Sequence, residues 1–139
     1  MTDYIARADV DVEASAQKVW DTITTDASEV NFGAEVDSDW RPGSPITWRG
    51  EWNGTSFEDR GEIVEADAPR RLVLTHYSPS SGAEDTPENH HRLTYELSEK
   101  EGVTHVAFSQ DGNASESAQA ESEKNWRQHL AAIKERAEA

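Results

Sequence analysis

The chain has 139 residues, a formal net charge of −15 and no cysteine. This length is typical of one domain, here residues 1–139, that buries a core without the help of cross-links. The lack of cysteine excludes disulfides, thiol catalysis and thiolate-bound metals. The excess of 28 acidic over 13 basic residues argues against nucleic-acid binding, because such a surface repels phosphate backbones.

The N-terminal segment predicts a strand followed by a short helix. Residues 4–12, YIARADVDV, place apolar side chains at alternate positions, which is the period of a strand with one buried face. Ser15 can then cap a helix through AQKVWDTIT, whose apolar residues share one side. Residues 26–34 predict a loop or a second short helix.

The middle of the chain predicts consecutive antiparallel hairpins. Turn signals separate runs of strand length, which are ITWRGEW, FEDRGEIVEA and RLVLTHY. Residues 78–90 form a long polar loop with two prolines. Two further predicted strands follow this loop, HHRLTYELS and VTHVAFSQ.

The C-terminal segment predicts a long helix. Asn113 and Glu116 have the spacing of a capping box. The apolar stripe of the helix consists of Trp126, Leu130, Ile133 and Ala137. The helix and the sheet each have one apolar face, and each must bury that face against the other. The sequence therefore predicts an α+β fold in which a curved antiparallel sheet of six to seven strands wraps around this helix, with one or two short helices after the first strand.

Five segments, in this order and spacing, resemble the SRPBCC, or START-like helix-grip, superfamily. They are KVWDTIT, RPGSPITWRGEW, GEIVEADAPRRLVLTHYSP, TYELSEKEGVTHVAFSQDGN and NWRQHLAAIKERAEA. Within the superfamily, the nearest match is the branch named after the activator of the heat-shock-protein-90 ATPase. The resemblance implies a cavity between the concave face of the sheet and the C-terminal helix. Members of the superfamily bind or transform hydrophobic small molecules such as lipids, sterols and polyketides.

Tryptophans concentrate in one predicted strand. Trp48 and Trp52 share one parity in ITWRGEW, so both rings face the same side of the sheet. Gly50 between them leaves space for a ligand or another backbone. The rings either pack in the core or line a cavity, and Trp40 lies at the edge of the preceding turn. The predicted ligand-binding residues are Trp48, Trp52, Tyr95, Phe108, Trp126 and Leu130.

Three polar residues are candidates for catalysis: His76, His91 and Gln110. Each is in phase with apolar residues of its own strand and could orient a ligand oxygen. A histidine could also act as a general base near neutral pH. The alternative is a hydrogen-bonded histidine at the end of a strand, because spacing identifies no partner carboxylate.

The pair His90 and His91 does not predict a metal site, because adjacent residues of an extended chain point to opposite sides. The sequence contains no phosphate loop and no dinucleotide fingerprint, and we expect no metal and no cofactor. We also expect no signal peptide, no membrane insertion and a cytoplasmic location, since no apolar run approaches the ~20 residues of a membrane span.

The leading functional hypothesis is a small domain that binds a hydrophobic or aromatic small molecule, as a monomer or weak dimer. The alternatives are an enzyme of the polyketide cyclase or dehydratase kind that uses the same cavity, and a protein-interaction module with a partner such as a chaperone.

Overall fold

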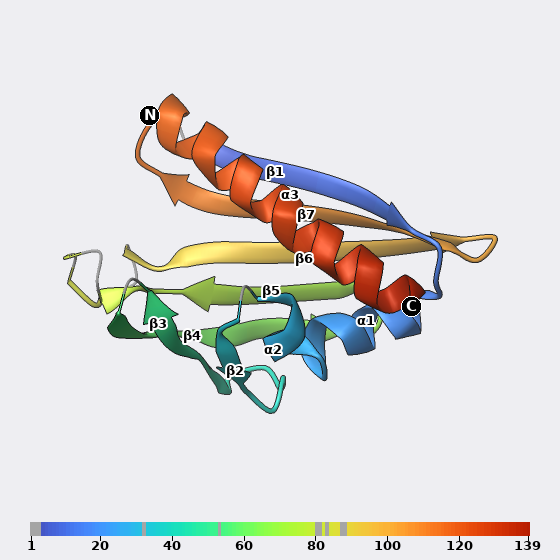
Figure 1. The fold of residues 1–139 in the computed structure, drawn as a ribbon, viewed down its shortest axis with the longest axis horizontal. Coiled ribbons are helices and arrows are strands. Elements are labelled where there is room, and N and C mark those ends of the chain that lie inside the picture. The colour runs from blue at the N-terminus through green and yellow to red at the C-terminus, as the bar shows by residue number, and fades with distance from the viewer. Residues whose placement is uncertain (1–3, 32, 53, 80–81, 83, 87–88) are drawn as a thin grey trace.

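A long helix lies across one face of a seven-stranded antiparallel sheet in the computed structural model of this protein (Figure 1). The structure describes residues 4–139 except residues 32, 53, 80–81, 83 and 87–88, and the side chain of Trp52 also lies outside the described part. In chain order the elements are β1 (Tyr4–Val12), α1 (Ala16–Thr24), α2 (Ala27–Val30), β2 (Glu35–Asp37), β3 (Pro45–Trp52), β4 (Thr55–Asp67), β5 (Arg71–His76), β6 (His91–Lys100), β7 (Val103–Asn113) and α3 (Glu116–Glu138).

The strands are arranged in the order β1-β7-β6-β5-β4-β3-β2. Strands β2 to β7 are therefore neighbours in sequence as well as in space, and β1 pairs with β7 at the far edge. In that pair Ala8 lies opposite Phe108, and Val12 lies opposite Thr104. The predicted α+β helix-grip architecture is confirmed, with seven strands and two short helices after β1.

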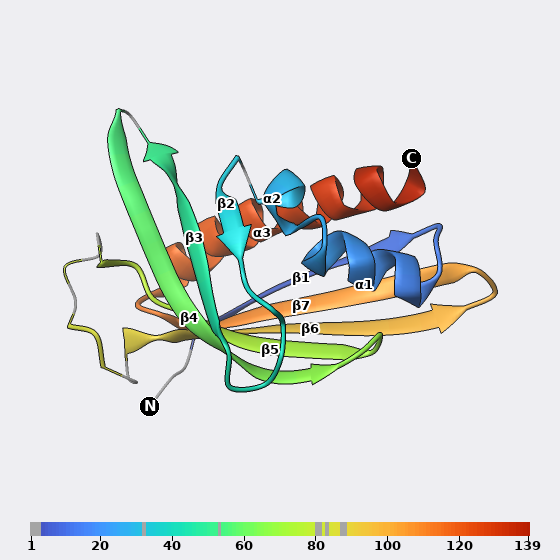
Figure 2. The ribbon, with the colours of Figure 1, turned by 90° about the horizontal axis from the view of Figure 1, so that it is seen from below.

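The sheet curls around the first half of α3, because β3 and β4 bend out of the plane of the other strands (Figure 2). A Cβ atom at Gly61 in β4 would lie 1.8 Å from the carbonyl oxygen of Thr75 in β5, so only glycine fits where these neighbouring strands approach each other so closely. The register between β4 and β5 also shifts between Ile63 and Glu65. A bulge of this kind increases the local bend and twist of a strand, and together with the glycine it lets the sheet close on the helix.

Serines cap the N-terminal ends of α1 and α3. The Ser15 hydroxyl accepts a hydrogen bond from a first-turn N–H of α1, as predicted. The prediction that Asn113 caps α3 is wrong, since the Ser115 hydroxyl accepts the hydrogen bond from the Ala118 N–H at 3.1 Å. Asn113 stays in β7, where its side-chain amide donates to the carbonyl oxygen of Tyr4 at 2.9 Å. The pairing of β1 with β7 thus extends further than the sequence pattern indicated.

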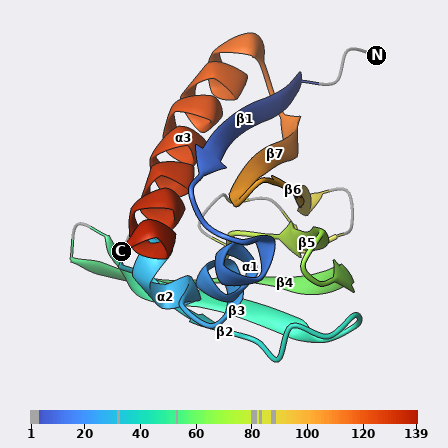
Figure 3. The same cartoon turned by 90° about the vertical axis from the view of Figure 1, so that its right-hand side faces the viewer.

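The core lies between the concave face of the sheet and the helices α1 and α3 (Figure 3). Ile63 and Leu72 from the sheet are fully buried with Leu130 and Ile133 from α3. Trp126, at the N-terminal end of the predicted helix stripe, is only partly buried. Trp126 also lines a cavity between the helix and the curled part of the sheet.

Candidate functional site

A cavity of about 690 Å³ lies between the bent strands and the first half of α3. Buried aliphatic side chains line its inner part, namely Ile46, Leu72, Leu74 and Leu93. Aromatic side chains also line it, namely Trp40, Trp48, Phe57, Tyr95 and Trp126. Exposed polar residues, including Glu51, Ser56 and Gln128, lie at its rim. The volume and the largely apolar lining fall within the range of small-molecule sites, roughly 300–1,000 Å³.

Three of the six predicted ligand-binding residues line the cavity: Trp48, Tyr95 and Trp126. Phe108 and Leu130, which are 2% and 1% exposed, belong to the core behind the wall. Alternation placed Phe108 on the correct face of the sheet, but Trp126 packs against it with ring centroids 4.3 Å apart. The side chain of Trp52, the sixth residue, lies outside the part of the chain that the structure describes.

Gln110 fixes the position of one aromatic wall residue. The indole N–H of Trp126 donates a hydrogen bond to the Gln110 side-chain oxygen, which links α3 to β7. Gln110 itself does not line the cavity among the described residues. The predicted catalytic candidate therefore holds Trp126 in place between Phe108 and the cavity.

Trp40 has a strained backbone next to the cavity. Its φ of 62° is in the left-handed region, which residues other than glycine rarely adopt and which costs about 1–2 kcal/mol. Its N–H donates to the Ser38 hydroxyl at 3.1 Å. The sequence placed Trp40 at the edge of a turn without assigning its side, and the structure adds it to the lining.

His76 lines the cavity and pairs with a carboxylate that the sequence analysis did not identify. Its Nε2 lies 2.9 Å from Oδ2 of Asp59, which also lines the cavity. The two side chains are 26% and 17% exposed. The indole of Trp48 meets the His76 ring edge-on, with centroids 4.8 Å apart. Asp59 shares its parity on β4 with Phe57 and Ile63, and an acidic residue at such an inward position was the available signal.

His91 contributes structure beside this pair. Its Nδ1 donates to the carbonyl oxygen of Asp111 at 3.0 Å, and its ring stacks on His76 with centroids 6.4 Å apart. A Cβ atom at Gly112 would lie 2.8 Å from the same Nδ1, so the histidine packs tightly over the end of β7. His91 does not line the cavity among the described residues.

A buried series of hydrogen bonds connects Tyr95 in the cavity wall to α3 and α2. The Nδ1 of His129 lies 2.6 Å from the carbonyl oxygen of Val30, and its Nε2 lies 2.8 Å from the hydroxyl of Tyr95. A carbonyl oxygen only accepts, so Nδ1 carries the hydrogen and the Tyr95 hydroxyl donates to Nε2. The series thus joins β6, α3 and the end of α2.

Burial keeps the two titratable groups of this series neutral. His129 is 1% exposed. Burial lowers its pKa from 6.5 to about 4, against a smaller opposing effect from the hydrogen bond to Val30. Burial also raises the pKa of Tyr95. His129 was not among the predicted site residues, although it lies three residues after Trp126 on the apolar side of α3.

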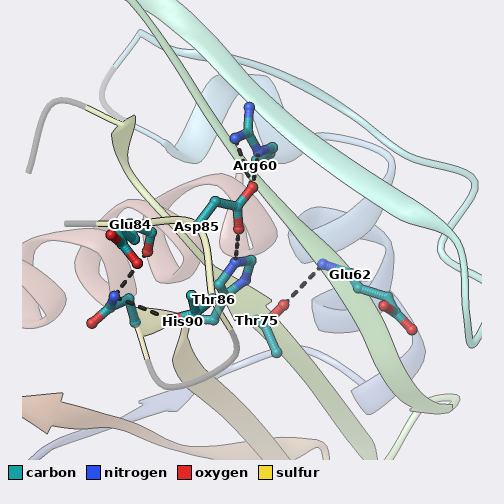
Figure 4. A network of polar contacts seen from close by, with 8 residues as sticks. Arg60, Glu62, Thr75, Glu84, Asp85, Thr86 and His90 are labelled. Atoms are coloured by element: carbon teal, nitrogen blue, oxygen red, sulfur yellow. Dashed lines mark hydrogen bonds and ion pairs between the residues drawn. The ribbon is translucent and has the colours of Figure 1, made fainter. Parts of the chain in front are cut away.

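A separate polar network holds the segment before β6 against β4 (Figure 4). Asp85 accepts hydrogen bonds from Arg60 and from Nε2 of His90, each at 2.6 Å. These hydrogen bonds, from His90 first and then Arg60, lower the pKa of Asp85. The His90 ring stacks on Tyr77 with centroids 5.1 Å apart. This second aspartate–histidine pair lies outside the cavity lining.

The described residues contain no group of three or more histidine, cysteine or acidic residues that could hold a metal ion. Within the same part of the chain, no helix is long and apolar enough to cross a membrane.

Comparison with known proteins identifies relatives of the whole domain. The profile of a family described as "Activator of Hsp90 ATPase homolog 1-like protein" matches residues 13–138. A solution structure of ChR145 from Cytophaga hutchinsonii is similar, with 37% identity, a TM-score of 0.82, and coverage of 94% of this chain and 91% of that one. None of the curated proteins compared with the chain matches it.

More distant structures share the fold. The Aha1 dimer from Colwellia psychrerythraea is 18% identical, with a TM-score of 0.73 and coverage of 99% of this chain and 97% of that one. CalU16 from Micromonospora echinospora is 19% identical, with a TM-score of 0.68 and coverage of 95% and 82%. The family profile spans all elements from α1 to α3, and these are the elements that build the cavity. The chain therefore belongs to the family of Activator of Hsp90 ATPase homolog 1-like proteins.

Proposed function

We propose that this protein binds a hydrophobic, aromatic small molecule in the cavity between β3–β6 and α3. The observation that carries the proposal is the cavity of about 690 Å³, whose walls contain Trp48 and Trp126 in fixed positions. Flat aromatic walls above an aliphatic floor favour a planar apolar ligand, because burial of apolar surface supplies most of the binding free energy. Members of the superfamily that the sequence resembles bind such molecules.

A neutral fluorescent probe, N-phenyl-1-naphthylamine, tests the proposal. We expect its emission to rise on saturable binding to the wild-type protein. The substitution Val36→Trp places an indole on a strand that lines the cavity, and it should lower the affinity roughly tenfold or more, because it occupies the ligand's space. Val64→Trp is the matched control, since Val64 is 39% exposed, lies on β4 and does not line the cavity. Equal binding by both variants, or no saturable binding by the wild type, would contradict the proposal.

The Asp59–His76 pair favours a second candidate function, the cyclase- or dehydratase-like enzyme. Both reaction types begin when a base removes a proton from the carbon next to a carbonyl, which leaves an enolate. In this candidate, His76 takes the proton and Asp59 stabilises the imidazolium. Hydrogen–deuterium exchange at the α-carbon of 2-tetralone, followed by NMR, tests this step. Exchange that is no faster with the wild-type protein than with His76→Phe would exclude His76 as the base.

The family name keeps a chaperone partner as a third candidate. Among the described residues, Val64 is the one large hydrophobic residue that is exposed, so we rank this function below ligand binding. Stimulation of a purified chaperone ATPase, measured together with the oligomeric state of this protein, tests the partner and the proposed monomer or weak dimer.

A further inference from the structure

The polar groups of the cavity indicate which aromatic molecules fit it. Resting on the proposed function, we propose that the ligand is an uncharged aromatic molecule whose hydroxyl donates a hydrogen bond to His76, and that carboxylates and phosphates are excluded.

One ring nitrogen of His76 is available to accept a hydrogen bond. The Asp59 carboxylate only accepts hydrogen bonds, so Nε2 of His76 carries the hydrogen, and in the neutral ring Nδ1 then has a lone pair. No described residue donates to Nδ1. No buried side-chain nitrogen or oxygen among the described residues lacks a partner. This nitrogen is therefore accessible on a residue that lines the cavity, and it can accept a hydrogen bond from a ligand.

The charged residues that line the cavity are acidic. Glu51 and Asp59 both line the cavity, and none of its described lining residues is a lysine or an arginine. The whole chain carries a net charge of −15. A ligand carboxylate or phosphate would enter without a counter-ion, next to two acidic groups, and burial of an unpaired charge is costly. An uncharged donor meets no such penalty.

The aromatic walls beside His76 favour a ligand whose hydroxyl is attached to an aromatic ring. Trp48 contacts the His76 ring edge-on, so the free acceptor lies next to an aromatic wall. Trp126 and Phe57 also line the cavity. A planar ligand that stacks between these rings brings a substituent on its own edge to His76. A phenol-type hydroxyl has this geometry, and it is also a strong hydrogen-bond donor.

Three matched naphthalenes test the proposal by quenching of tryptophan fluorescence at pH 7: 2-naphthol, 2-methoxynaphthalene and 2-naphthoate. They share one ring system. The first carries a hydroxyl that donates a hydrogen bond, the second has no donor, and the third carries a negative charge. We expect 2-naphthol to bind roughly three- to tenfold more tightly than 2-methoxynaphthalene, which is the effect of one net hydrogen bond. We expect 2-naphthoate to bind roughly tenfold or more weakly than 2-methoxynaphthalene, because of the nearby carboxylates.

Two histidine variants localise the effect. His76→Phe keeps an aromatic ring against Trp48 and removes the acceptor, so it should abolish the preference for 2-naphthol over 2-methoxynaphthalene. Cooperative urea unfolding of the variant shows that it is folded. His90→Phe is the matched control, because His90 has the same kind of carboxylate partner but lies outside the cavity lining. It should retain the preference.

The outcomes separate this inference from the proposed function. Equal binding of 2-naphthol and 2-methoxynaphthalene, tightest binding of 2-naphthoate, or an unchanged preference in His76→Phe would each overturn the inference while aromatic binding stands. If none of the three compounds quenches the fluorescence saturably, aromatic binding fails, and the inference that rests on it fails too.

Discussion

One buried histidine, His129, should make an unfavourable contribution to the stability of this protein in mild acid. Burial lowers the pKa of His129 from the ordinary value of 6.5 to about 4 in the folded protein. Between these values the unfolded chain binds a proton that the folded protein does not, so each pH unit in this interval removes about 1.4 kcal/mol of unfolding free energy. From pH 7 to pH 4.5 the contribution of His129 alone should decrease by about 2 kcal/mol. The stabilising contribution is therefore present above pH 6.5 and is lost as the pH falls.

The assay is urea unfolding of the wild type and of His129→Asn at pH 7 and at pH 4.5. Asparagine has an amide N–H near the position of Nδ1, which retains a donor towards the carbonyl oxygen of Val30, and it does not titrate. The other acidic groups affect both proteins equally, so the difference between the two unfolding free energies isolates His129. We expect the variant to be less stable at pH 7 and the difference to narrow by about 2 kcal/mol at pH 4.5. A difference that is independent of pH would refute the assignment of a neutral, buried His129.

Three further predictions concern stability and binding. Gly61→Ala should destabilise the protein by about 3 kcal/mol or more in urea unfolding, because the new Cβ meets a backbone carbonyl oxygen. Gly50→Ala is the matched control and should cost less, because the nearest contact there is a phenylalanine ring 3.0 Å away. Gln110→Leu should cost about 1 kcal/mol and weaken N-phenyl-1-naphthylamine binding, because the Trp126 N–H loses its acceptor; unchanged probe affinity would mean that the hydrogen bond does not position the ring. Ser115→Ala should cost about 1 kcal/mol through loss of the α3 cap, and no measurable change in the unfolding midpoint would contradict this assignment.

Residue periodicity was sufficient to predict the architecture. Alternation along β6 identified Tyr95 as inward-facing, and helical spacing identified Leu130 and Trp126 as one stripe. Each of these patterns is set by local backbone geometry, which a sequence displays directly.

The details of the candidate site depend on long-range geometry, and the sequence does not display that. Asp59 meets His76 because β4 approaches β5 closely at Gly61, in a register that includes a bulge. Phe108 was assigned to the cavity wall because parity gives the face of a strand but not its depth below Trp126. His129 lies beside the helix stripe, but its hydrogen-bond partners Tyr95 and Val30 lie 34 and 99 residues away in sequence.

The pairing of β1 with β7 also has a consequence for how the protein is made. The two strands are separated by about ninety residues or more, and α3 packs on both β1 and β7. A growing chain can form the β3–β4–β5 hairpins early, yet it cannot complete the sheet until β7 has left the ribosome, and it cannot cover the sheet until α3 has followed. A cavity wall that includes Trp126 does not exist in a nascent chain that ends before α3, so binding of a fluorescent probe reports that α3 has been made and has folded onto the sheet.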